Sequence, residues 1–118
     1  MENIIWIIKN GQLDELEKLN FNCNVVLDTK GQCPLHIAAD FKHIDVIKYL
    51  INKGADVNKT NNYNQTPLLL AIFENQLQAV KLLLKAGANC NMKYDESWYV
   101  DLAESDEMKK LLKEYLDN

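Results

Sequence analysis

Glycine, proline and cysteine are all scarce in this sequence of 118 residues, which contains four glycines, two prolines and three cysteines. The low glycine and proline content excludes collagen-like and low-complexity chains, which depend on those two residues. An odd number of cysteines without a closely spaced pair favours a reducing compartment over a disulfide framework. The length favours a single domain over residues 1–118, large enough to bury a core without covalent links.

Long apolar runs and an excess of positive charge are also missing. The run IIWII near the N-terminus is five residues long, whereas a membrane span needs about 20 and a secretory signal needs a basic start. We therefore expect a cytoplasmic protein, with the nucleus as the alternative. The formal net charge of −4 argues against general nucleic-acid binding and permits a protein partner with a basic surface.

What the sequence does contain is an internal repeat. Residues 33–58 align without a gap on residues 66–91, at a constant offset of 33. The offset is far too regular for chance, so it points to a repeat architecture. The identical pairs are Pro34 and Pro67, Leu35 and Leu68, Ala38 and Ala71, Lys48 and Lys81, Leu50 and Leu83, Gly54 and Gly87, Ala55 and Ala88, and Asn58 and Asn91.

Each copy predicts a helix, a turn and a second helix. Pro34 and Pro67 suit the first turn of a helix, where no amide donor is needed. Apolar residues then recur at helical spacing, and Gly54 and Gly87 suit the position just past a helix end. The flanking segments 4–19 and 100–116 read as diverged copies, as expected of terminal repeats.

The predicted fold is therefore all-α, a solenoid of about four helix–turn–helix repeats whose terminal copies are diverged or truncated. We expect the repeats at approximately residues 1–29, 30–62, 63–95 and 96–118.

The stretches PLHIAAD and IDVIKYLINKGADVN, with the 33-residue period, resemble the ankyrin repeat. The stretches WIIKNGQLDEL, TPLLLAIFEN and KLLLKAGAN, followed by a truncated last copy, resemble the myotrophin family of small ankyrin-repeat proteins. That resemblance implies binding and sequestration of the heterodimeric actin capping protein, by covering the basic surface with which it binds filament barbed ends. The alternative is an adaptor or inhibitor of another protein, such as a transcription factor or a kinase.

Two cysteines and two histidines in one window, Cys23, Cys33, His36 and His43, raise the alternative of a zinc site. Structural zinc sites favour closely paired cysteines, and none are present here. Leu69 occupies the position that matches His36, so a structural role is favoured and a leucine at 36 is expected to be tolerated.

Catalysis by Cys33 and His36 as nucleophile and base is a further alternative. No phosphate loop, serine elbow or paired-carboxylate motif accompanies them. We therefore expect no enzyme activity, no metal and no cofactor.

A monomeric solenoid is expected to bind its partner on the face built by the first helix of each repeat and the connecting loops. Trp6 should lie on that face if the isoleucines around it fill the core, and an exposed tryptophan is a typical interface anchor. The predicted binding residues are Trp6, Lys9, Thr29, Lys30, Gln32, Asp40, Phe41, Tyr63, Asn64, Phe73 and Glu74. The resemblance to the myotrophin family implies that Trp6, Thr29, Lys30 and Asp40 contact capping protein.

Overall fold

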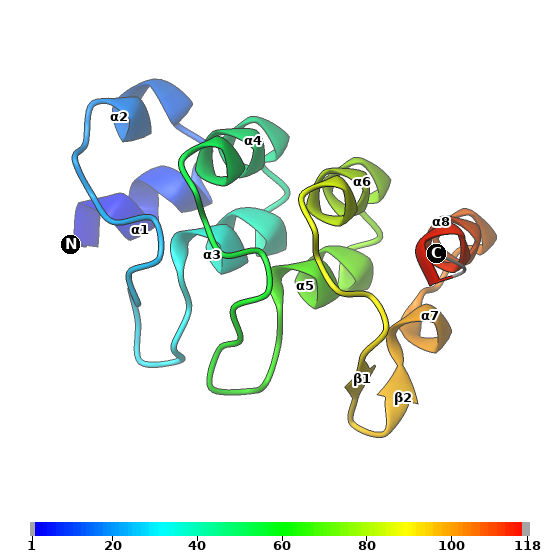
Figure 1. Cartoon of the computed structure of the whole chain (residues 1–118). Helices are drawn as coiled ribbons and strands as arrows, with labels where there is room; N and C mark the ends of the chain where they lie inside the picture. Colours follow the sequence, from blue (N-terminus) through cyan, green and yellow to red (C-terminus); the bar gives the residue numbers. More distant parts are fainter. Residues whose placement is uncertain (1, 117–118) are drawn as a thin grey trace.

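The structure, a computed structural model that describes residues 2–116, consists of four helix pairs stacked in a row (Figure 1). The inner helices are α1 (Glu2–Lys9), α3 (Pro34–Asp40), α5 (Pro67–Phe73) and α7 (Tyr99–Leu102). The outer helices are α2 (Leu13–Glu17), α4 (Ile44–Asn52), α6 (Leu77–Lys85) and α8 (Asp106–Leu116). Three long loops, here called fingers 1, 2 and 3, span residues 18–33, 53–66 and 86–98 and project below the inner helices in Figure 1. The predicted helix–turn–helix solenoid is confirmed.

Helix ends follow the local sequence signals. Pro34 and Pro67 are the first residues of α3 and α5, where a missing amide donor costs nothing. At the start of α5 the hydroxyl of Thr66 accepts a hydrogen bond of 3.2 Å from the backbone N–H of Leu69. Gly54 and Gly87 follow α4 and α6 at φ of 94° and 99°, the left-handed conformation in which glycine ends a helix without strain.

A short hairpin in finger 3 is the one regular element that the sequence did not predict. Strand β1 (Lys93–Tyr94) pairs antiparallel with β2 (Ser97–Trp98). Asp95 and Glu96 form the turn at φ of 51° and 70°, as two-residue hairpin turns require. Because neither residue is the glycine or asparagine that usually marks such a turn, the sequence carried no clear hairpin signal.

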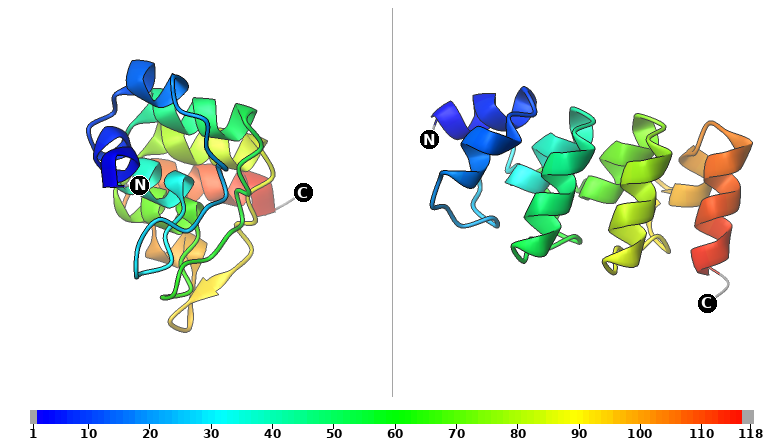
Figure 2. Two further views of the ribbon diagram at one scale, coloured as in Figure 1. Left: turned by 90° about the vertical axis from the view of Figure 1, so that its left-hand side faces the viewer. Right: turned by 90° about the horizontal axis from the view of Figure 1, so that it is seen from above.

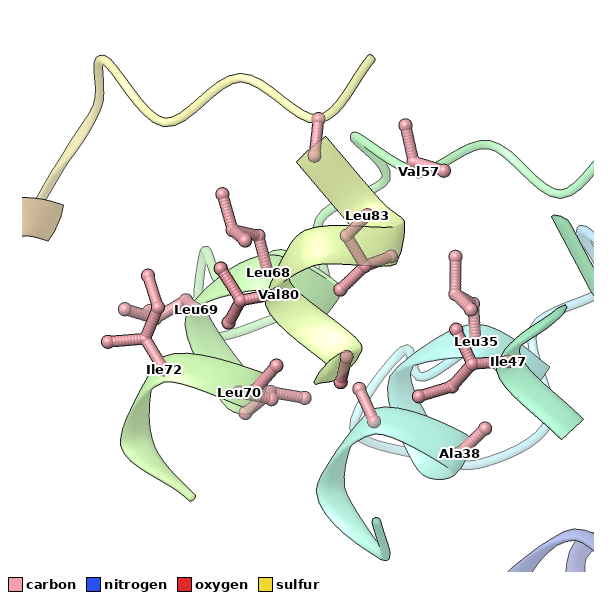
Figure 3. Packing of buried hydrophobic residues seen from close by; sticks show 14 of the residues in the cluster. Leu35, Ala38, Ile47, Val57, Leu68, Leu69, Leu70, Ile72, Val80 and Leu83 are labelled. Atoms are coloured by element: carbon pink, nitrogen blue, oxygen red, sulfur yellow. The ribbon is translucent and has the colours of Figure 1, made fainter. Parts of the chain in front are cut away.

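The core is one continuous layer between the inner and outer helices. In Figure 3, Leu68 of α5 lies beside Val80 and Leu83 of α6, and the same arrangement recurs one repeat earlier with Leu35 and Ile47. All five side chains are fully or almost fully buried. Truncating a buried leucine of this kind to alanine typically costs about 2–5 kcal/mol, so each repeat depends on its helix pair and on the adjacent pair.

Asparagine side chains connect successive fingers. Asn24 accepts a hydrogen bond of 2.7 Å from the backbone N–H of Asp56, and its amide donates to the carbonyl of Gly54 at 3.4 Å. Asn58 repeats the arrangement, accepting from Asn89 N–H at 2.8 Å and donating to the Gly87 carbonyl at 3.2 Å. Each asparagine therefore satisfies two backbone groups that follow the next outer helix.

Replacing Asn58 with alanine should lower the free energy of unfolding by about 1–2 kcal/mol, because two inter-repeat hydrogen bonds are lost. Asn91 is the matched control, since it holds the same position in the next repeat and its side chain makes no hydrogen bond within residues 2–116. Asn91→Ala should change stability by less than about 0.5 kcal/mol. Urea unfolding of both variants measures the difference. Equal losses of stability in the two variants would contradict the role of the Asn58 side chain in connecting successive fingers.

Candidate protein-binding face

Five large aromatic side chains are exposed on the inner helices and the fingers. Trp6 of α1 is 57% exposed and Tyr63 of finger 2 is 56% exposed, and the others are Phe41, Phe73 and Trp98. Trp6 is exposed, whereas Ile4, Ile7 and Ile8 of the same helix are buried in the core and Ile5 is partly buried against it. We call this surface, formed by the inner helices and the fingers, the inner face.

Successive helix ends are linked across the inner face. The ammonium of Lys9 at the end of α1 lies 5.4 Å from the ring centroid of Phe41, which follows α3. The ammonium of Lys42 lies 3.3 Å from a carboxylate oxygen of Glu74, which follows α5. Such exposed contacts contribute little to stability, so a partner could replace them at small cost.

Asp40 lies among charged groups from three segments. Burial is the main reason why the pKa of this carboxyl lies above its ordinary value, and the charge of Glu74 raises it further. Lys30 of finger 1 and Lys9 of α1 oppose this rise. The structure thus brings together four predicted residues, the basic Lys9 and Lys30 and the acidic Asp40 and Glu74.

The finger tips are held by a repeated backbone turn. Asp28 accepts hydrogen bonds of 3.0 Å from the backbone N–H groups of Lys30 and Gln32. Asn61, which lies 33 residues later, accepts from Tyr63 at 2.9 Å and from Gln65 at 3.0 Å. Burial raises the pKa of Asp28, but the hydrogen bonds from Gln32 and Lys30, with the Lys30 charge, outweigh it and leave the pKa below its ordinary value. Lys30 and Tyr63 are therefore presented on ordered loops.

Three predicted residues have local structural contacts. The amide of Gln32 donates to Asp28 at 3.3 Å, and the carbonyl of Thr29 accepts from the Asn62 side chain at 2.9 Å. Asn64 is exposed at φ of 60° in the turn of finger 2, a conformation that asparagine tolerates well. Gln32 thus stabilises finger 1, and Thr29 and Asn64 have exposed side chains beside the tips.

Tyr94 and Trp98 of the hairpin were not predicted as binding residues. Tyr94 packs edge-on against Phe73 with ring centroids 6.0 Å apart, and the Lys93 ammonium lies 4.7 Å above the Trp98 ring. The hairpin thereby extends the aromatic surface from α5 to finger 3. One signal in the sequence could have placed Trp98 on a finger. The 33-residue period puts Trp98 at the position that matches Gln65 of finger 2.

His36 is fully buried, and both of its ring nitrogens are hydrogen-bonded. The Cys33 N–H donates to Nδ1 at 3.1 Å, which places the ring proton on Nε2, and Nε2 donates to the Gln65 carbonyl at 3.0 Å. His36 therefore caps α3 and connects it to finger 2, and neither nitrogen has a lone pair available for a metal. The thiol of Cys33 is also buried, which raises its pKa and disfavours the nucleophilic thiolate.

The other members of the cysteine and histidine window have separate partners. The Cys23 thiol donates to the Lys53 carbonyl, and His43 Nε2 lies 2.7 Å from the Lys9 carbonyl. Within residues 2–116, no group of three or more histidine, cysteine, aspartate or glutamate side chains is placed to hold a metal ion. In the same span, no helix combines the length and the apolar character needed to cross a membrane.

The role of Leu69 corrects one expectation. The sequence suggested that leucine at 36 would be tolerated because Leu69 occupies the matching position. In that repeat, however, Thr66 caps α5, and its hydroxyl shares a hydrogen bond of 2.9 Å with the hydroxyl of buried Tyr99. Thr66 and Tyr99 thus make the connections that His36 makes one repeat earlier, and a leucine at 36 would have no such substitute.

A family model described as "Ankyrin repeats (3 copies)" matches residues 4–94. The chain belongs to the ankyrin-repeat family. Ankyrin-repeat solenoids are typically protein-interaction modules, and the match indicates no family of enzymes.

Known ankyrin-repeat proteins from bacteria and animals are similar to this chain. A putative ankyrin repeat protein of Rickettsia bellii is 36% identical over 100 residues, covering 83% of this chain and 37% of that protein. The nuclear factor NF-kappa-B p105 subunit of Gallus gallus is 34% identical over 88 residues, covering 70% of this chain and 9% of that protein. The transient receptor potential cation channel subfamily A member 1 of Drosophila melanogaster is 37% identical over 71 residues, covering 60% of this chain and 6% of that protein. The alignments thus span 37% or less of these relatives' lengths.

His36→Leu should lower the free energy of unfolding by about 1–3 kcal/mol near pH 7.5, because the Cys33 N–H and the Gln65 carbonyl lose a buried partner. Burial is the main reason why the pKa of His36 is lowered, and hydrogen bonding only partly opposes it. The unfolded chain therefore binds more protons once the pH falls below about 6.5. This contribution to stability is fully present above that pH and declines in acid.

Consequently, the difference in stability between the wild type and His36→Leu should shrink from pH 7.5 to pH 5. Urea unfolding at several pH values measures this difference. A difference that is constant or grows in acid would contradict the assignment of a buried, neutral His36.

Proposed function

We propose that this ankyrin-repeat module binds a protein partner on the inner face, with Trp6, Phe41 and Phe73 as its anchors. The observation that carries the proposal is the exposure of these large aromatic rings on three successive repeats. Aromatic side chains of this kind contribute a large share of binding energy at protein interfaces. Their backbones belong to packed helices and turns, so little conformational entropy is lost on binding.

The charge of the inner face favours a partner with a basic surface. Asp40 and Glu74 are the sequence neighbours of the anchors Phe41 and Phe73, and after burial the charge of Glu74 contributes to the raised pKa of Asp40. A cation from the partner would relieve the repulsion between these carboxylates. Together with the net charge of −4, the two carboxylates would also accelerate and orient the encounter.

The specific partner that we propose is the heterodimeric actin capping protein, bound in the cytoplasm. Support comes from the resemblance of WIIKNGQLDEL, TPLLLAIFEN and KLLLKAGAN to the myotrophin family. In this mechanism, the inner face covers the basic surface with which capping protein binds the barbed end. Trp6, Asp40, Thr29 and Lys30 are the residues proposed for the contact.

A second candidate is an ankyrin adaptor or inhibitor of another protein, such as a transcription factor or a kinase. The similarity to the nuclear factor NF-kappa-B p105 subunit supports this candidate, which would also allow a nuclear location. The same aromatic anchors would serve either partner, so a binding experiment is needed to distinguish them.

Actin elongation from barbed ends in the presence of capping protein is the decisive measurement. The wild-type module should restore elongation, and Trp6→Ala with Phe41→Ala should weaken this effect at least about tenfold, because interface anchors of this type contribute about 2 kcal/mol or more. Glu17→Gln, exposed on outer helix α2, is the control and should act like the wild type.

No effect of the wild type at a large excess over capping protein would overturn the specific proposal. Co-purification of a transcription factor or kinase, lost in the Trp6 and Phe41 variant and retained in Glu17→Gln, would then favour the second candidate.

A further inference from the structure

Outer helices α4 and α6 lie side by side on the face seen from above in the right-hand view of Figure 2. A groove runs between them, away from the inner face. Half-buried Ile44, Ile51 and Leu82 form its apolar floor, and exposed Lys48, Lys81 and Lys85 line it. No acidic side chain lines this groove, so its charge is entirely positive.

The neighbouring grooves on the same side differ in charge. The groove between α2 and α4 is lined by Asp14, Glu15 and Asp45 and by no lysine. Between α6 and α8, Lys81 and Lys110 are balanced by Glu107 and Glu114. Since the same stacking geometry accepts acidic, basic and mixed linings, packing of the helices does not require the three lysines of the α4–α6 groove.

Within residues 2–116, the three lysines form no salt bridge and lie over no aromatic ring. Among residues 2–116, the lysines that form salt bridges are Lys18 and Lys42. The lysines whose ammonium groups lie over aromatic rings are Lys9, Lys53 and Lys93. Lys48, Lys81 and Lys85 make none of these contacts. Positive charge beside exposed aliphatic surface is complementary to a segment that carries carboxylates next to apolar side chains.

We propose that the α4–α6 groove binds an acidic amphipathic helix of a second protein, so that the module can bridge two partners. Lys81 and Lys85 are four residues apart on α6 and thus lie on one side of the helix, about 5–6 Å apart at Cβ. Glutamates four residues apart on the bound helix would have the same spacing. Leucines on its adjacent side would cover Ile51 and Leu82, whose apolar surface supplies affinity that charge alone does not.

The surroundings of the groove favour a narrow protein segment over a wider polyanion. A membrane with anionic lipids would meet Asp14, Glu15 and Asp45 of the adjacent acidic groove, and like charges repel it. Nucleic acids gain affinity from many phosphate contacts, whereas this groove offers three lysines. A single helix, about 10–12 Å across with its side chains, is narrower than either.

The test is an amide NMR titration with a synthetic acetylated peptide of about fifteen residues, long enough to form a helix on binding, in which glutamates flank one stripe of leucines. At low salt, shifts should be confined to α4 and α6. Lys81→Gln with Lys85→Gln should weaken binding about fivefold, from two exposed ion pairs of about 0.5 kcal/mol each. Lys18→Gln with Lys93→Gln removes the same charge from fingers 1 and 3 and should leave the affinity unchanged.

Several results would overturn the proposal. One is that the peptide shifts amide signals of the inner face, and another is that it binds both lysine double variants equally weakly. A third is tighter binding of the module to phosphatidylserine-containing vesicles or to a DNA oligonucleotide than to the peptide. A fourth is that amide signals of the groove shift on dilution without peptide, which would indicate that a second copy of the module occupies it. Trp6→Ala with Phe41→Ala should bind the peptide normally, which separates this test from that of the inner face. Failure of either test therefore leaves the other unaffected.

Discussion

A single helix pair of this protein cannot bury its own apolar side chains, and the whole structure depends on stacking one pair against the next. Leu68, Val80 and Leu83 have no exposed surface because adjacent repeats cover them (Figure 3). The energetics of such a stack come from each repeat and from its nearest neighbours. This stacking explains the 33-residue offset in the sequence. Only a constant repeat length keeps each helix packed against the matching helix of the next repeat.

This constraint separates the residues that stack from those that are free to vary. Ala38 and Ala39 are fully buried, and their small size allows inner helices to approach each other. Immediately after them, Asp40 and Phe41 turn outward, and their counterparts Phe73 and Glu74 do so one repeat later. Residue identity at these positions is not dictated by packing, which is why carboxylates and aromatic rings can gather on one face.

The period and the glycine signals predicted most of the fold, because they reflect interactions within one repeat or at one fixed offset. The connection between Thr66 and Tyr99 could not be predicted in this way, since it replaces a histidine with two residues at other positions. The hairpin was missed for a similar reason. Asp95 and Glu96 both adopt positive φ, and Glu96 stands where such a turn usually has glycine. Predicted site residues at the ends of the inner helices, such as Phe41 and Phe73, are exposed, while Tyr94 and Trp98 were overlooked with the hairpin.

The two sides of the stack can diverge independently for the same physical reason. Exposed side chains on the inner face and on the outer helices are separated by the buried layer, and substitutions at sites more than about 7–10 Å apart without shared partners have nearly additive effects. A change at Lys85 therefore alters the charge of the α4–α6 groove without disturbing Phe41, and the reverse also holds. The acidic, basic and mixed grooves between successive outer helices show how far charge can vary while the stack is maintained. A repeat protein of this size can consequently carry two recognition surfaces on one core.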